Sequence, residues 1–235
     1  MKWGAVIGSV ALAAFASLPA RAADMTPIAQ RAIPAGYIPA QFLWTGFYLG
    51  AGIGGGFGSA PFLDPFGTTA SPSLKGFLLG GVAGVNYQIN SFVFGVEGDF
   101  YASWAKGTAL DPIGDALQTQ VFWTATFTGR LGWAFDRLLI YGKGGAAFDY
   151  DRDTVFQPSG VVVVGSTNRA GWTVGGGVEY AVTEHWTTRI EYDYLRFPAK
   201  GFVFTGQGVG IAPLNVGGTV GINLSEIKLI VANKF

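Results

Sequence analysis

The sequence predicts an all-β fold, an eight-stranded antiparallel up-and-down transmembrane β-barrel, from three observations. In eight stretches, apolar residues alternate with small or polar residues at a period of two, which is the period of a β-strand. The charges in these stretches fall on one parity, while the other parity is apolar and rich in aromatic residues. Charged residues make up only 13% of the 235 residues, about half the share of roughly 25% in soluble domains. A polar lumen surrounded by lipid accounts for all three.

The eight strands are predicted, in order, from the apolar residues at every second position. We expect them at 44–58, 75–88, 92–102, 119–135, 138–150, 169–182, 186–196 and 222–235. The outward residues that predict the first four are Phe47, Leu49, Ala51 and Ile53; Phe77, Leu79, Ala83, Val85 and Tyr87; Phe92, Phe94, Val96 and Phe100; and Val121, Trp123, Phe127, Leu131, Trp133 and Phe135. Those of the last four are Leu138, Ile140, Ala146, Phe148 and Tyr150; Trp172, Val174, Val178 and Tyr180; Trp186, Ile190, Tyr192 and Tyr194; and Ile227, Leu229, Val231 and Phe235. None of them is charged, as contact with lipid requires.

Short and long connections alternate between the predicted strands. The short turns are at 89–91, 136–137 and 183–185, and the long stretches, rich in Gly, Pro, Ser and Asp, are 59–74, 103–118, 151–168 and 197–221. Outer-membrane barrels have short periplasmic turns and longer external loops. We therefore expect both ends of the barrel domain on the periplasmic side of a bacterial outer membrane.

The N-terminal residues are typical of a Sec export signal. Lys2 precedes an apolar stretch, and an A-x-A cleavage site ends at Ala22. We expect residues 1–22 to be a signal peptide, 23–43 to be a flexible periplasmic segment, and 44–235 to form the barrel. Cleavage removes Lys2 and Arg21 from the 15 basic residues and none of the 15 acidic ones, which leaves a net charge of −2. This charge excludes a basic nucleic-acid-binding protein.

Outward aromatic residues gather at both predicted ends of the barrel. Folding the hairpins places Tyr87, Phe92, Trp133, Tyr180, Trp186 and Phe235 at the periplasmic rim, and Phe77, Phe100, Trp123, Tyr150, Trp172 and Tyr194 at the other rim. Because aromatic rings prefer the membrane interfaces, we interpret these sets as two aromatic girdles.

The inward parity carries charges of both signs. These are Glu97, Asp99, Arg130, Lys143, Glu179, Arg189, Glu191, Asp193, Glu226 and Lys228. Eight strands leave an interior just wide enough for side chains to fill, and a buried charge has to be paired. We interpret these residues as a structural charge network that fills the lumen, and a polar channel is the alternative.

A glycine-rich pattern and the single histidine resemble parts of a nucleotide-binding site and of a catalytic site, but their positions do not support either role. The stretch 50–55 matches the G-x-G-x-x-G dinucleotide pattern, but it lies inside a predicted strand with no helix after it. Its inward glycines more simply make room for bulky residues across the lumen. His185, the single histidine, falls in a predicted turn without the nucleophile and carboxylate that a catalytic base needs. With one histidine and no cysteine, no histidine-based metal cluster can be drawn. We expect no catalytic, cofactor-binding or metal-binding residues.

An ordered series of segments resembles the opacity-type outer-membrane β-barrel family of Alphaproteobacteria, the group that includes the 25/31 kDa surface antigens. The segments are Trp44–Gly50, Gly95–Asp99, Thr128–Gly132, Tyr141–Gly145, Gly171–Tyr180, Arg189–Tyr192 and the last residue, Phe235. The resemblance spans 44–235 and implies an eight-stranded barrel without catalytic residues. It also implies insertion by the barrel-assembly machinery, with Phe235 as the assembly signal, and roles in envelope integrity and surface interaction.

We therefore expect an integral outer-membrane barrel with a structural and surface-interaction role, and not an enzyme. A small-solute porin is the first alternative, and it requires a continuous water path through the lumen. A lipid-modifying outer-membrane enzyme is the second, which the position of the single histidine disfavours. The expected partners are outer-membrane lipids and lipopolysaccharide, the barrel-assembly machinery during insertion, and surface ligands of the loops, but not nucleic acid.

Overall fold

Antiparallel β-strands make up nearly all of the described chain. The computed structural model describes residues 42–63, 69–110, 114–156, 162–207 and 215–235. The strands are β1 (Gly46–Ser59), β2 (Phe62–Leu63), β3 (Thr69–Ala70), β4 (Ser73–Ile89), β5 (Phe92–Ser103), β6 (Lys106–Leu110), β7 (Ala116–Phe135), β8 (Leu138–Phe156), β9 (Val162–Ala181), β10 (Trp186–Gln207) and β11 (Asn215–Lys234). The expected signal peptide, and the expected flexible segment up to residue 41, lie outside the described residues. No described segment forms a helix long and apolar enough to cross a membrane.

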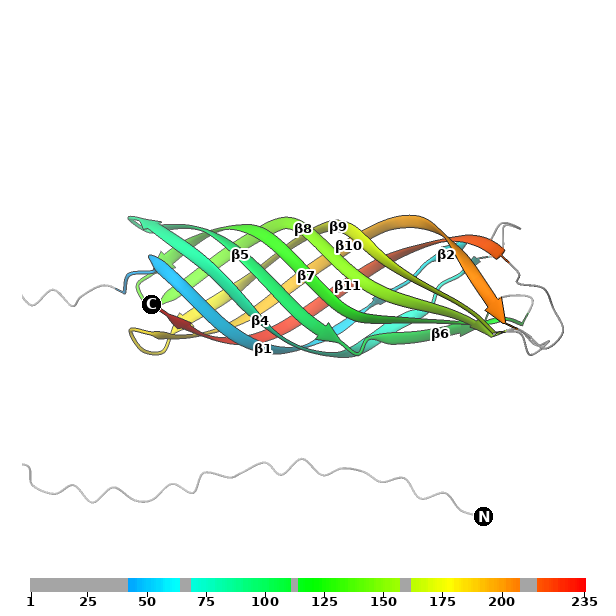
Figure 1. Ribbon diagram of the computed structural model, residues 1–235. Helices are drawn as coiled ribbons and strands as arrows, with labels where there is room; N and C mark the ends of the chain where they lie inside the picture. The colour runs from blue at the N-terminus through cyan, green and yellow to red at the C-terminus, as the bar shows by residue number, and fades with distance from the viewer. Residues whose placement is uncertain (1–41, 64–68, 111–113, 157–161, 208–214) are drawn as a thin grey trace, which may run out of the picture. The chain divides into compact units, whose positions relative to one another are not determined.

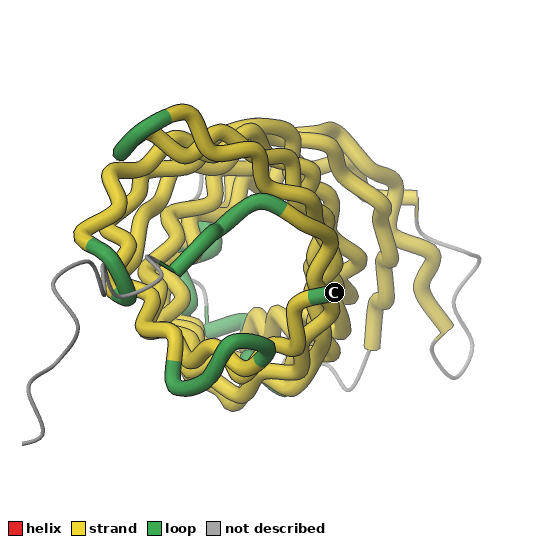
Figure 2. The backbone as a smooth tube through the Cα atoms, turned by 90° about the vertical axis from the view of Figure 1, so that its left-hand side faces the viewer, coloured by secondary structure: helices red, strands yellow, loops and turns green. Residues whose placement is uncertain are grey.

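Eight of the strands pair into a closed ring (Figures 1 and 2). The order is β1, β4, β5, β7, β8, β9, β10 and β11, and β11 pairs back with β1, where Lys234 lies opposite Tyr48. The short strands lengthen this ring: β6 pairs with β7 beyond the end of β5, and β2 pairs with β11 beyond the end of β1. The predicted all-β antiparallel arrangement is confirmed, with the eight expected strands in their expected order.

The two ends of the ring differ in their connections. One end carries tight turns at Asn90–Ser91 and Asp136–Arg137 and the turn 182–185, and we call it the turn end. Asn90 and Asp136 have φ angles of 54° and 53°, in the left-handed region that Asn and Asp adopt more readily than most residues. The C-terminal Phe235 also lies there (Figure 1). The opposite end, where β2, β3 and β6 lie, is called the loop end.

The strands run further toward the loop end than the sequence predicts. β8 continues to Phe156 and β9 begins at Val162, so most of the expected loop 151–168 is a paired hairpin. In the same way, β6, β7, β10 and β11 enter the expected loops 103–118 and 197–221. The predicted loop bounds are therefore wrong. Asp, Gly, Ser and Pro in these stretches favour a loop in the sequence, but the backbone hydrogen bonds between antiparallel strands do not depend on these side chains.

A β-bulge reverses one predicted orientation. Val121 on β7 lies opposite Asp151 on β8, whereas Trp123 lies opposite Tyr150, so Phe122 is an extra residue in β7. The extra residue shifts the alternation by one position. Val121, which the sequence places on the outward face, is therefore buried inside the ring.

Side chains fill the interior of the ring in layers. The turn-end plug consists of Phe42, Trp44, Val93, Ala134, Leu139, Tyr141 and Ala181. The loop-side plug consists of Ala60, Leu74, Ala105, Val121, Ala147, Leu195, Phe197, Val220, Ile222 and Leu224. Buried charged residues such as Glu97, Arg130 and Lys143 occupy positions between these two apolar clusters along the strands, whereas the buried Asp149, Asp151 and Asp153 follow Ala147 on β8. The centre of the ring, which looks open in the backbone view of Figure 2, therefore contains packed side chains.

Phe42 and Trp44 close the turn end from inside. The Phe42 amide donates to Asp136 Oδ1 at 2.9 Å, and the Trp44 indole Nε1 donates to the Asp136 carbonyl at 3.0 Å. The Trp44 amide donates to Gln88 Oε1 at 2.8 Å, and the Phe42 and Trp44 rings meet edge-on. The folded part therefore includes Phe42, two residues before the boundary that the sequence predicts.

Candidate functional site

The ten inward charges that the sequence predicts all lie buried inside the ring. They are the acids Glu97, Asp99, Glu179, Glu191, Asp193 and Glu226 and the bases Arg130, Lys143, Arg189 and Lys228. Each takes an inward position of its strand, and together they come from six neighbouring strands, from β5 to β11. We call this set the lumen network.

Two arginines organise the part of the lumen network nearest the turn end. Arg130 Nη2 lies 2.7 Å from Glu179 Oε2, and Arg189 Nη2 lies 2.5 Å from Glu97 Oε2. The Tyr48 hydroxyl donates to Glu97 at 2.7 Å and accepts from Arg130 at 3.0 Å. The Arg130 guanidinium also stacks 3.9 Å above the centre of the Tyr141 ring. Each guanidinium is thus held by charge pairing and by aromatic contact.

Lys143 organises the adjoining part of the network. Its Nζ lies 2.7 Å from Glu191, 3.2 Å from Asp193, and 3.3 Å from both Glu97 and Asp99. Oxygens of Glu97, Asp99 and Glu191 lie within 4.8 Å of one another, a spacing that could hold a metal ion. The ammonium group of Lys143 supplies the positive charge at this position instead.

Inward glycines make room for the large side chains of the lumen. A Cβ atom at Gly84 would lie 2.3 Å from the Tyr48 hydroxyl, and one at Gly52 would lie 2.5 Å from the Tyr101 hydroxyl. The glycine pattern at 50–55 lies wholly within β1. For Gly52, the contact with Tyr101 agrees with the interpretation of the inward glycines as space for neighbouring side chains.

A second group of buried charges was not predicted from the sequence. It comprises Asp149, Asp151 and Asp153 on β8 and Arg169 on β9, and we call it the acidic group. The Arg169 guanidinium pairs with Asp151 and lies 3.5 Å from Asp153. Asp149 shares its strand parity with Lys143, and Arg169 shares its parity with Glu179. This shared parity could have predicted that Asp149 and Arg169 point inward. The expected loop at 151–168 hid the pattern, because the predicted strands end there.

The predicted girdle residues lie on the outer surface of the ring. At the loop end, Phe100 and Trp123 have ring centres 5.7 Å apart, and Trp172 and Tyr194 are 5.8 Å apart. At the turn end, Phe92 and Trp133 meet edge-on at 4.5 Å, and Tyr87 and Trp186 are exposed. Trp104, 6.1 Å from Phe77, was missed because it lies in the expected loop 103–118.

Between the two aromatic sets, the outer surface of the ring is apolar. Exposed residues there include Phe47, Leu49, Ile53, Leu79, Phe94, Val96, Phe127, Leu131, Ile140, Phe148, Val174, Val178, Ile190, Ile227, Leu229 and Val231. Soluble monomers rarely expose apolar patches larger than a few hundred Å². A surface of this kind requires an apolar surrounding.

Exposed basic residues lie next to the loop-end aromatic set, on the side away from the turn end. They are Lys75, Lys106, Arg152, Arg196 and Lys200, and we call them the basic rim. Lys75 on β4 lies directly opposite Lys106 on β6. Like charges at directly opposed positions destabilise a sheet unless an anion lies between them.

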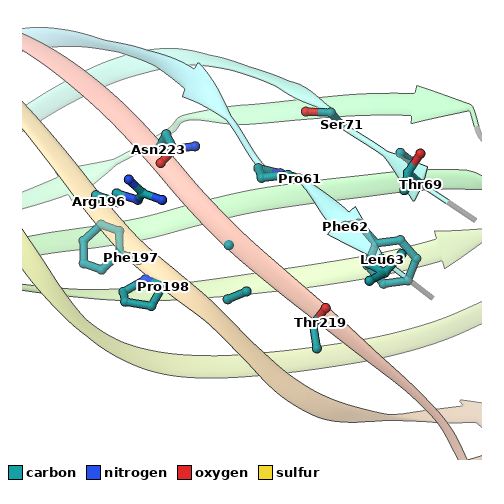
Figure 3. A pocket seen from close by; sticks show the side chains of 13 residues that line it. Pro61, Phe62, Leu63, Thr69, Ser71, Arg196, Phe197, Pro198, Thr219 and Asn223 are labelled. Atoms are coloured by element: carbon teal, nitrogen blue, oxygen red, sulfur yellow. The ribbon is translucent and has the colours of Figure 1, made fainter. Parts of the chain in front are cut away.

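A cleft of about 550 Å³ opens beside the basic rim (Figure 3). It lies between the β2–β3 hairpin and the β10–β11 ladder, whose register shifts between Phe197 and Lys200. Phe62 and Pro198 line it, and Arg196 contributes a charged side chain. The lining is therefore mainly apolar with one basic group.

The last two predicted positions lie at the turn end. His185 is exposed in the turn 182–185. Phe235 has a side chain that is 75% exposed, and its main-chain amide donates to the Phe47 carbonyl at 2.8 Å. Phe235 thus joins the last strand of the ring to the first.

Comparison with known proteins gives a consistent set of similarities. Residues 9–212 match the family described as the outer membrane protein β-barrel domain. The chain is 33% identical over 217 residues to a 31 kDa outer-membrane immunogenic protein of Brucella melitensis, covering 83% of this chain and 89% of that protein. It is 31% identical over 167 residues to a 22 kDa outer membrane protein of Rhizobium leguminosarum, covering 68% and 67% of the two chains.

Among solved structures, the fold is similar to that of the outer membrane protease OmpT from Escherichia coli. The TM-score is 0.58 at 10% sequence identity, and the match covers 83% of this chain and 98% of that chain. At this identity the similarity concerns the fold alone.

Proposed function

Because this chain belongs to the family of outer membrane β-barrel proteins, we propose that it is an eight-stranded transmembrane barrel with a structural role in the outer membrane. The apolar band between the two aromatic sets supports the spanning orientation, since aromatic rings favour the two interfaces. We further propose Sec export, with both ends of the barrel domain in the periplasm and the loop end at the cell surface. The tight turns beside Phe235 support this orientation.

The packed interior of the ring is the observation that favours a structural role over a porin. The lumen network lies between the turn-end plug and the loop-side plug, and both plugs consist of buried apolar residues. A conducting path would have to cross both apolar clusters and hydrate charges that are now ion-paired. Paired charges in an eight-stranded barrel act instead as internal cross-links between strands.

Electrical recording in planar lipid bilayers tests this role directly. The mature protein should insert without producing steady conductance, because no ion can pass the two plugs. An open porin reconstituted in the same lipid serves as the positive control. Stable single-channel steps from the unmodified protein would show an open lumen and would place the porin function first.

We also propose that the protein has no enzymatic activity. OmpT is named a protease, but its sequence is only 10% identical to this one, so the similarity concerns the fold and not the activity. Here the single histidine lies in an exposed turn at the turn end. The carboxylates of Glu97, Glu179 and Glu191 lie in the lumen and are ion-paired.

The basic rim supports lipopolysaccharide as the main lipid partner. Its five exposed bases follow the loop-end aromatic set, at the level where the phosphate groups of outer-leaflet lipid would lie in the proposed orientation. The opposed pair of Lys75 and Lys106 offers two ammonium groups to one phosphate, which would remove their mutual repulsion.

Replacing Lys75 and Lys106 together by Gln should reduce the lipopolysaccharide that remains bound after detergent purification. The amount is measured by mass spectrometry of lipid A per mole of protein. Arg137→Gln, in a turn at the opposite end, is the matched control and should retain the wild-type amount. Equal retention by the double variant would contradict phosphate binding at this pair.

A further inference from the structure

The acidic group contains three carboxylates but only one basic side chain. Asp149, Asp151 and Asp153 occupy three successive inward positions of β8, about 7 Å apart along the strand. All three are at most 2% exposed, and Arg169 is the single basic residue in the group. Three carboxylates therefore share one guanidinium.

Arg169 is committed to the two aspartates nearer the loop end. Its Nη2 pairs with Asp151 Oδ2 and lies 3.5 Å from Asp153 Oδ2, and its Nη1 donates to the Val220 carbonyl at 2.8 Å. Asp153 also accepts a hydrogen bond of 2.5 Å from the Thr119 hydroxyl. Both carboxylate oxygens of Asp153 therefore have a polar partner.

Asp149 lacks such partners. Its side chain is 0% exposed, and among the described residues neither of its carboxylate oxygens has a hydrogen-bond partner of good geometry. Thr124 lies opposite Asp149, but its hydroxyl donates to Glu226 at 3.1 Å. The Oδ1 atom of Asp151 also lacks a partner. An ionised carboxylate cannot remain buried in this condition without a compensating cation or a proton.

We propose that Asp149 and Asp151 bind one divalent cation of the hard class, Ca²⁺ or Mg²⁺, inside the loop-end half of the barrel. Three carboxylate oxygens without partners point to this class, because hard cations prefer oxygen ligands and complete their shell with water. The bound ion reduces the excess negative charge that Arg169 leaves. Unlike the Lys143 position, this one has no lysine among its ion pairs within the described part of the chain.

The site lies beside the loop-side plug, because Ala147 of that plug precedes Asp149 along β8 and Val121 of the same plug lies opposite Asp151. The cation reduces the repulsion between Asp149 and Asp151 on β8, next to the pair that Asp151 makes with Arg169 on β9.

Calorimetric titration of the mature protein with CaCl₂ and MgCl₂ tests the proposal. The protein is refolded in an uncharged detergent without lipopolysaccharide, at pH 8 and constant ionic strength. We expect one bound divalent ion per chain and a rise of the unfolding temperature by about 5 °C at saturating cation. Asp149→Asn should weaken binding at least about tenfold and abolish the thermal shift.

Glu184→Gln, an exposed residue of the turn 182–185, is the control and should bind as the wild type does. Asp151→Asn provides a second test if the Asp149 variant does not fold. No binding to the wild-type protein at millimolar cation would overturn the proposal and leave Asp149 as a protonated acid. Equal binding to wild type and to both Asn variants would also overturn it, because the ion would then lie elsewhere.

Discussion

Replacing Arg130 by Ala should lower the free energy of unfolding by about 3–5 kcal/mol, because it leaves the buried Glu179 carboxylate without its nearest cation. The guanidinium lies 2.7 Å from Glu179 and also packs on the Tyr141 ring. The other cation near Glu179, Arg189, is 3.6 Å away and already pairs with Glu97. Urea unfolding of the protein in lipid vesicles, followed by tryptophan fluorescence, measures the loss.

Two controls separate a charge network from a hydrated lumen. In the double variant Arg130→Ala with Glu179→Gln, much of the lost stability should return, because no uncompensated charge remains. Arg196→Ala removes an arginine from the outer surface and should leave the urea midpoint nearly unchanged. If Arg130→Ala costs little stability and instead produces channels of altered ion selectivity, the lumen is hydrated and the structural role is wrong.

Deleting Phe235 should prevent assembly, leaving the protein in the periplasm, where it is degraded. The Phe235 amide bonds to the Phe47 carbonyl at the point where β11 closes on β1, and its exposed ring lies at the turn end. Without it, the last strand loses both this hydrogen bond and the aromatic side chain that we propose the barrel-assembly machinery reads. Membrane fractionation with immunoblotting measures the amount of protein in the outer membrane.

The matched control is deletion of residues 23–40, which retains Phe42 and Trp44. These two residues carry the contacts of the N-terminal segment with Asp136 and Gln88. The shortened protein should reach the outer membrane at normal levels. Normal levels of the Phe235 deletion would refute the role of this residue in assembly.

Alternation of apolar residues predicted the faces of the strands, apart from Val121 beside the bulge in β7. A one-residue error in register would place every side chain of a strand on the wrong face, so a consistently uncharged outward parity strongly constrains the register. The positions of Glu97, Arg130 and Glu191 follow from the same parity. Their individual partners do not, because pairing depends on which strands become neighbours in the closed ring.

The features that the sequence did not reveal have separate physical causes. The bulge at Phe122 arises from the pairing of β7 with β8, which no single strand encodes. The stretch 151–168, into which β8 and β9 extend, contains Asp151, Asp153 and a Pro-Ser-Gly sequence at 158–160, which are residues typical of a loop. The burial of Trp44 was not predicted, and its indole is held inside the turn end because the Asp136 carbonyl accepts its hydrogen bond.

Closure of the ring by β1 and β11 determines the order in which this chain can fold. Tyr48 and Lys234 lie opposite each other, so the seam joins the first and last strands of the ring. One edge of β1 therefore stays unpaired until β11 is in place, and hairpins made earlier cannot complete the cylinder. Open edges recruit other chains and lead to aggregation. The chain consequently depends on protection until its last strand is available, and closing the seam is the slowest contact to form by loop entropy.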